Sequence, residues 1–239
     1  AKYRYISLDI ETSGFDPETE EVLEVGFCVF DVSSSGCEIV SEWTRVFKPS
    51  KPVSSKILSL TGISQAELDT AAPFAESKAE LQELLGTAGI VGHNISFDIR
   101  FLQKNGITFS GESIDTLELV QFVLPTHHSY NLENLAHYFK IAHADAHRAL
   151  PDARAAVVLL DRLLTRYAGY PSELKAEAEL LLKGSGTPWE VLLGVVSAPA
   201  APLDPKPKAQ KYSSLGELPE QAFIVAPVSV DVTERFVGA

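Results

Sequence analysis

The stretch that decides the fold stands at the start of the chain, where Lys2 to Gly14 reads KYRYISLDIETSG. Its first part, Lys2 to Ile10, is rich in β-branched and aromatic residues, and Thr12, Ser13 and Gly14 then form a turn signal. This pattern predicts a strand. Because side chains alternate along a strand, Asp9 and Glu11 are expected to project from the same face.

Two further β-rich runs follow, Glu21 to Val32 and Glu38 to Phe47. They are separated by Ser33-Ser34-Ser35-Gly36, a composition typical of a turn between paired strands. We therefore predict an antiparallel hairpin beside the first strand. A short apolar strand is expected between Gly89 and Gly92.

From Pro49 onward the periodicity becomes helical. Ser64 and Glu67 have the spacing of a capping box, which predicts a helix start. Leu81, Leu84 and Leu85 are expected to continue an amphipathic face. Further helices are predicted by the segments Ser96 to Lys104, Leu132 to Phe139 and Pro151 to Tyr167, with Pro151 at the first helical position.

Strands followed by alternating strand and helix predict one α/β domain with a mixed sheet, over residues 1–168. A short helical extension is expected over 169–198, from Pro171 to Lys183 and from Thr187 to Val196, the second capped by Thr187 with Glu190. A proline-rich linker over 199–212 and a tail over 213–239 should follow. The tail, with its β-like run from Phe223 to Val232, is interpreted as a partner-binding segment or the start of a further domain.

The composition narrows the class of protein. The 239 residues carry 20 Lys+Arg against 32 Asp+Glu, a net charge of −12, with 45% hydrophobic residues and two cysteines. No apolar run is long enough for a membrane span, and no signal-peptide pattern is present, so we expect a cytoplasmic protein without membrane contact. Cys28 and Cys37 are expected to be reduced thiols. The acidity argues against a broad basic surface coating nucleic acid, but it leaves a metal-dependent nuclease open.

Several carboxylates are candidate metal ligands. Asp9 and Glu11 place two carboxylates on one strand face, where a hard divalent cation binds oxygen ligands. Asp98 and Asp152 each fall in the first turn of a predicted helix, where an acidic residue also simply complements the helix dipole. His147, five residues before Asp152, titrates near neutral pH and is a candidate general base.

Three segments together resemble the motifs of the DEDDh exonuclease family: LDIETSG at 8–14, HNISFD at 93–98 and HRALPD at 147–152. That family includes the proofreading subunit or domain of bacterial replicative polymerases, ribonuclease T and oligoribonuclease. The order of the motifs and the His-x-x-x-x-Asp spacing agree over residues 1 to about 168. Motif matches of this kind still require their strand and helix context.

The resemblance implies a ribonuclease H-like fold, with a mixed five-stranded sheet flanked by helices, and hydrolysis from the 3′ end. It implies two Mg²⁺ or Mn²⁺ ions held by Asp9, Glu11, Asp98 and Asp152, with His147 as general base. Two metal ions held in this way activate a water and stabilise the leaving oxygen. The histidine removes the proton of the attacking water.

The resemblance also implies contacts with the terminal nucleotide at Ile10, Thr12, Thr61 and Phe97. Core packing and turn formation are the competing interpretation of these four residues. Asn94 is expected to cap or orient its loop rather than to bind metal, and Asp115-Thr116 to start a helix. The remaining histidines are expected at solvated positions: His127, His128, His137 and His143.

The leading hypothesis is a metal-dependent 3′→5′ exonuclease that releases nucleoside 5′-monophosphates from single-stranded DNA ends in proofreading or repair. A polymerase or helicase partner is expected to bind through residues 170–239. An exoribonuclease of RNA processing or turnover remains an alternative. A non-catalytic tethering module is a third, which the full set of catalytic residue types disfavours.

Overall fold

The computed structural model describes residues 2–143 and 146–196. All of them belong to one compact unit, whereas a second unit, residues 200–239, lies outside the described residues. The predicted linker over 199–212 and the tail over 213–239 therefore also lie outside them. Within the described residues, no helix is both long and apolar enough to span a membrane.

Five strands form one mixed sheet in the order β3-β2-β1-β4-β5. The strand β1 (Tyr3–Thr12) pairs antiparallel with β2 (Val22–Ser33), which pairs antiparallel with β3 (Gly36–Val46). On its other side β1 pairs parallel with β4 (Ile90–Gly92), and β4 pairs parallel with β5 (Ser113–Asp115). The predicted hairpin and the mixed five-stranded sheet are thereby confirmed.

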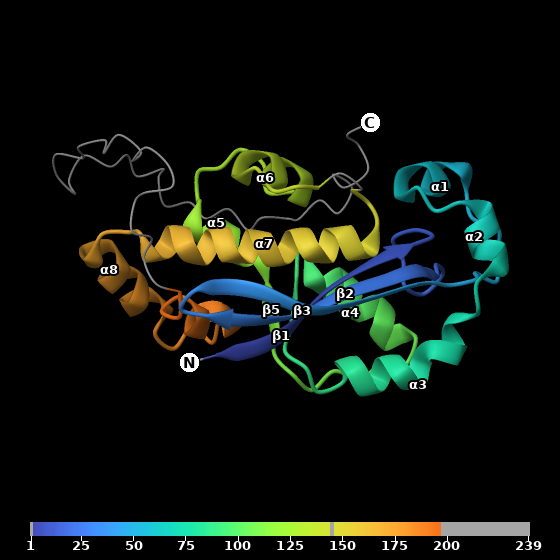
Figure 1. Ribbon diagram of the computed structural model, residues 1–239, viewed down its shortest axis with the longest axis horizontal. Helices are drawn as coiled ribbons and strands as arrows, with labels where there is room; N and C mark the ends of the chain where they lie inside the picture. Colours follow the sequence, from blue (N-terminus) through green and yellow to red (C-terminus); the bar gives the residue numbers. More distant parts are fainter. Residues whose placement is uncertain (1, 144–145, 197–239) are drawn as a thin grey trace. The chain divides into compact units, whose positions relative to one another are not determined.

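Helices cover both faces of the sheet (Figure 1). One face carries the long helix α7 (Ala149–Ala168), against which α5 (Thr116–Val123) and α6 (Leu132–Phe139) pack. The other face carries α3 (Phe74–Leu85) and α4 (Ile95–Lys104). Two short helices, α1 (Ser55–Thr61) and α2 (Gln65–Thr70), connect β3 to α3.

Alternation along β1 and β2 separates two apolar cores. Phe30 and Val32 belong to the cluster under α7, while Val25 and Phe27 belong to the cluster under α3 and α4. Since successive side chains point to opposite faces, each strand contributes to both cores, as a sheet buried on both sides requires.

Helix α7 approaches the sheet closely because β2 carries a glycine beneath it. A Cβ atom on Gly26 would lie 2.3 Å from the backbone nitrogen of Leu150, closer than any side chain allows. The helix begins at Ala149, two residues earlier than predicted, so Pro151 stands at the third helical position. That position tolerates proline because the N–H groups of the first turn have no partner within the helix.

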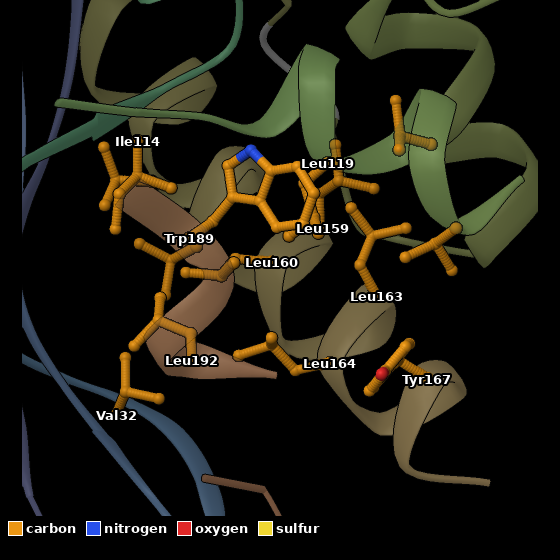
Figure 2. Packing of buried hydrophobic residues seen from close by; sticks show 14 of the residues in the cluster. Val32, Ile114, Leu119, Leu159, Leu160, Leu163, Leu164, Tyr167, Trp189 and Leu192 are labelled. Carbon is orange, nitrogen blue, oxygen red and sulfur yellow. The ribbon is translucent and has the colours of Figure 1, made fainter. Parts of the chain in front are cut away.

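The region after α7 is part of the same core. Helix α8 (Ser172–Leu182) and the 3₁₀ helix η1 (Pro188–Leu192) bury Leu182, Trp189 and Leu192 against residues of α5 and α7. Figure 2 shows the Trp189 indole among Ile114, Leu119, Leu159 and Leu160.

Side-chain caps begin α2 and α5, and one predicted cap is not formed. The capping box of Ser64 and Glu67 is confirmed, and Asp115 caps α5 by accepting a hydrogen bond from the Leu117 N–H. The capping box predicted for Thr187 is wrong: its hydroxyl lies 2.9 Å from that of Ser185, and a 3₁₀ turn follows.

The buried face of α3 is narrower than predicted. Leu84 is 40% exposed, so it does not share the buried face of Leu81 and Leu85. Both cysteines are free thiols.

Candidate active site

Three carboxylates meet at the end of β1 that faces α7. One oxygen from each of Asp9, Glu11 and Asp152 lies within 4.8 Å of the others. Asp9 and Glu11 come from one face of β1, as predicted, and Asp152 comes from the first turn of α7. Asp9 and Asp152 are buried, and Glu11 is partly exposed.

This donor set fits a divalent cation. Hard ions such as Mg²⁺ and Mn²⁺ are bound through carboxylate oxygens, and they offset the cost of holding several like charges in a partly buried site. Without such a charge, close carboxylates destabilise one another's ionised forms. The acidic cluster can therefore hold a divalent metal ion between the end of β1 and the first turn of α7.

Asp98 is not a member of this cluster among the described residues. It lies on α4, and its side chain is almost fully buried. Its Oδ1 accepts a hydrogen bond of 2.9 Å from the backbone N–H of Ile10, the residue between Asp9 and Glu11. Asp98 thus connects α4 to the strand segment that carries two of the clustered carboxylates.

The turn before α4 is held by polar contacts from neighbouring elements. Asn94 has a left-handed backbone, with φ 61°, and its side chain makes no capping hydrogen bond. Its N–H instead donates to Oδ1 of Asp115 at 2.8 Å, so Asn94 orients the loop through its backbone. The pKa of Asp115 is raised, mainly because the carboxyl group is buried. The N–H groups that donate to its carboxylate act in the opposite direction but are outweighed.

His93, the first residue of the same motif, is buried between two other segments. Its Nε2 donates to the carbonyl of Tyr130 at 2.7 Å, and its Nδ1 lies 2.9 Å from the Thr116 hydroxyl. These contacts join β4, α5 and the loop before α6. His93 therefore fixes the position of the loop from which α4 starts.

His147 lies in the loop that leads into α7, two residues before the helix begins. It is partly buried, and its backbone is left-handed, with φ 66°. A residue with a side chain is uncommon in this region and stays there only when its surroundings hold it. His147 is five residues before Asp152 in the sequence, but it is not a member of the acidic cluster in the structure.

Sequence reasoning missed His143. It was expected at a solvated position, but its side chain is only 6% exposed, and its Nε2 lies 2.6 Å from Oδ1 of Asp152. This hydrogen bond raises the pKa of His143. No spacing rule could have found the contact, because it depends on how His143 and the first turn of α7 come together in the folded chain. Of the other histidines, His128 and His137 are exposed, as predicted, and His127 is partly buried.

The four predicted substrate contacts lie in or beside the protein core. Ile10 packs in the cluster under α4, and the Phe97 ring packs at a tilt against Phe101, with ring centroids 4.9 Å apart. The Thr12 hydroxyl donates to the carbonyl of Gly14, and the Thr61 hydroxyl donates to the carbonyl of Ile57. All four side chains therefore have packing or turn-forming contacts of their own.

The start of α7 is held by a carboxylate from β2. Glu24 is 2% exposed and accepts two hydrogen bonds from the Arg148 guanidinium, from Nε at 3.0 Å and from Nη2 at 2.9 Å. It also accepts the Ala149 N–H at 3.0 Å. The bond to Glu24 is the main cause that raises the pKa of Arg148, with smaller effects from Glu67 and Glu11.

Comparisons with known proteins place these features in a family. A family model described as exonuclease (RNase T) matches residues 6–160. The PolC-type DNA polymerase III of Thermotoga maritima is 35% identical over 155 residues, which are 63% of this chain and 11% of that protein. The 3′-5′ exonuclease DinG of Bacillus subtilis is 29% identical over 176 residues, 71% of this chain and 18% of that protein. The chain thus spans a small part of the curated relatives that it matches.

Solved structures share the fold. Exonuclease X in complex with 5′ overhanging duplex DNA has a TM-score of 0.55 and 24% identity, covering 73% of this chain and 98% of that one. E. coli Exonuclease I in complex with a dT13 oligonucleotide has a TM-score of 0.60 and 17% identity, covering 75% of this chain and 44% of that one. At these identities the likeness is evidence for the architecture alone.

Proposed function

From the premise that this chain belongs to the RNase T family of exonucleases, we propose that it is a metal-dependent 3′→5′ exonuclease acting on DNA. The observation that carries the proposal is the group of three carboxylates, from β1 and the first turn of α7, with oxygens within 4.8 Å. The two curated relatives described above are a DNA polymerase and a 3′-5′ exonuclease, which favours DNA over RNA.

We assign the metal ligands to Asp9, Glu11, Asp98 and Asp152. Two Mg²⁺ or Mn²⁺ ions held there would activate a water and stabilise the leaving 3′ oxygen during attack on the phosphodiester. Asp98 would join the set from α4, next to the strand it already contacts through Ile10. The His143 contact supports the placement of the Asp152 carboxylate.

His147 is the proposed general base, taking the proton of the attacking water on an imidazole nitrogen. A positioned histidine in this role contributes about a hundredfold to ten-thousandfold in rate. The products would be nucleoside 5′-monophosphates released from single-stranded ends. We place Ile10, Thr12, Thr61 and Phe97 at the terminal nucleotide, since three of them adjoin proposed metal ligands in sequence.

We further propose that the exonuclease works beside a polymerase or helicase in proofreading or repair. The aligned relatives support this, because the matched segment is 11% of the length of a PolC-type DNA polymerase III. We place the partner contact in residues 170–239. Within the described part of that range, the partner would meet the solvent-facing side of α8 rather than its core-facing residues.

A time course on 5′-labelled single-stranded DNA and RNA of the same sequence tests the proposal, with Mg²⁺, Mn²⁺ or EDTA and with Asp9→Ala as the inactive control. We expect a metal-dependent ladder that shortens from the 3′ end, faster on DNA. Circular single-stranded DNA should stay intact, because it has no end. Faster degradation of RNA would reassign the substrate, and a folded protein that cleaves neither polymer would overturn the enzymatic assignment.

A further inference from the structure

The contact between Arg148 and Glu24 lies next to the proposed general base and is not part of the acidic cluster. Arg148 follows His147 directly, and both of its hydrogen bonds end on one buried carboxylate of β2. Two parallel N–H···O bonds fix the orientation of a guanidinium as well as its position. The backbone that bears His147 is therefore attached to the sheet one residue away.

Glu24 also supplies the cap that α7 lacks in its own sequence. Arg148 occupies the N-cap position, has an extended backbone and makes no side-chain capping bond. The Ala149 N–H donates to Oε2 of Glu24 instead. One carboxylate thus holds the residue after His147 and the first turn that carries Asp152.

The strand register places this carboxylate beside the candidate site. Glu24 and Glu11 are directly paired across β1 and β2, and Asp9 is paired with Gly26. Residues paired in this way share a face of the sheet. The close approach of α7 over Gly26 then fixes the distance between the helix start and both strands.

The left-handed backbone of His147 needs such a restraint. A residue with a side chain at φ 66° lies in a sparsely populated backbone region and keeps this conformation only when its neighbours impose it. On one side of His147 the chain is bonded to Glu24 through Arg148 and Ala149. Loss of the two-bond geometry would free the loop to relax toward ordinary backbone angles.

We propose that Arg148 is a positioning residue that, clamped by Glu24, holds the imidazole of His147 in place for proton transfer. This inference rests on the proposed function, because it concerns the same reaction. Arg148 acts through His147 and touches neither substrate nor metal in this role. A misplacement of about 1 Å in a catalytic group can cost about a hundredfold in rate.

The test is a double-mutant cycle of Arg148→Lys and His147→Ala. Lysine keeps the positive charge beside Glu24 but cannot donate the two parallel hydrogen bonds of a guanidinium. We expect Arg148→Lys to lower kcat on a single-stranded DNA oligonucleotide by about 10- to 100-fold, with KM and the Kd for Mn²⁺ changed by less than about twofold. In the His147→Ala background it should cause almost no further loss, since the group it positions is gone.

Arg154→Lys is the matched control. Arg154 of α7 donates two parallel hydrogen bonds of the same kind to Glu42 of β3, with its Nε 2.6 Å from Oε1. It lies on the far side of Asp152 from His147 in sequence, so its loss should leave kcat unchanged within about twofold. An equal loss in both lysine variants would mean that any weakened α7 contact slows the enzyme and would overturn the proposal.

A measurement without substrate separates this inference from the proposed function. In the ¹H NMR spectrum of the metal-free protein, the ring signal that disappears in His147→Ala should shift in Arg148→Lys, while the buried His93 signal stays in place. An unshifted His147 signal would overturn the positioning role, whether or not the protein is active. An inactive wild type with a shifted signal would contradict the proposed function alone.

Arg148→Lys keeps the charge but cannot satisfy both oxygens of the buried Glu24, and a buried carboxylate that loses a hydrogen bond costs stability. If Arg148→Lys unfolds, the double variant Glu24→Gln/Arg148→Gln removes both charges together. We expect that variant to fold and to show the same loss of kcat. Wild-type kcat in the folded double variant would contradict the proposal.

Discussion

The two ends of the interface between α7 and the sheet share the same elements but differ in composition. Toward the carboxyl end of α7, Leu160, Leu163 and Leu164 are fully buried against Phe30 and Val32 of β2 and their neighbours. At the other end, the same helix and strands bring Asp152, Asp9 and Glu11 together. Apolar burial stabilises the interface at one end, and the other end carries charges that cost stability.

The difference shows how one helix–sheet interface both stabilises the fold and holds the acidic cluster together. Apolar side chains gain roughly 25 cal/mol per Å² of buried surface, so the leucine-rich end supplies free energy of folding. Close carboxylates repel one another and gain nothing from burial. The apolar end therefore fixes the position of α7 on the sheet. The acidic end can then keep a geometry that is unfavourable until a cation binds.

The largest expected effect is at the acidic end. Asp9→Ala should lower exonuclease activity at least about a thousandfold, because it removes one of the clustered carboxylates. Saturating Mn²⁺ should raise the melting temperature of the wild type by about 5–10 °C, since ligand at 100 times its Kd stabilises by about 2.7 kcal/mol. Asp9→Ala should show no such rise in a calorimetric scan.

Glu38→Ala is the control for the loss of one negative charge, because Glu38 is exposed on β3. It should keep both the activity and the Mn²⁺-dependent rise. If Asp9→Ala kept the rise as well, the acidic cluster would not be the metal site.

A smaller effect, on stability alone, is expected at the apolar end. Leu160 is fully buried (Figure 2), so Leu160→Ala should lower the free energy of unfolding by about 2–5 kcal/mol. The rate per folded molecule should stay near that of the wild type, because the acidic end keeps its ligands. Urea unfolding followed by fluorescence, together with activity assays well below the transition, measures both.

Leu181→Ala is the matched control, since Leu181 of α8 is 79% exposed. Its effect should stay within about 0.5 kcal/mol. A loss of activity in Leu160→Ala as large as that in Asp9→Ala would mean that the two ends are not separable.

The smallest expected effect concerns a group of three charged residues, Asp31 with Arg4 and Lys2, at the apolar end of the sheet. Hydrogen bonds from Arg4 and Lys2 hold the pKa of Asp31 well below its usual range. A carboxylate with a lowered pKa in the folded state contributes stability above its unfolded pKa of about 3.9, and this contribution is lost as the pH falls. Asp31→Asn should therefore lose less stability than the wild type between about pH 6 and about pH 3, as measured by urea unfolding. Parallel losses would show that the ionisation of Asp31 does not couple to folding.

The sequence by itself determined the elements whose cause is local. The β-branched and aromatic residues of Lys2 to Ile10 predicted β1, and the alternation of side chains along a strand predicted the shared face of Asp9 and Glu11. The Ser64-Glu67 spacing predicted the start of α2. Three motifs together predicted the exonuclease family. Such patterns depend on neighbours within a few residues, so no tertiary contact is needed to recognise them.

The tertiary structure decided what depends on distant partners. Helix α7 begins at Ala149 because Glu24, 125 residues earlier, accepts its first N–H. His143 lies on Asp152 rather than at a solvated position because its imidazole meets a carboxylate of α7, nine residues further along the chain. Trp189 and Leu192 complete the α7 core, although their own segment predicts only a short helix. Hydrogen bonds and apolar contacts between remote segments form only once the sheet register places them together, and no local pattern encodes that register.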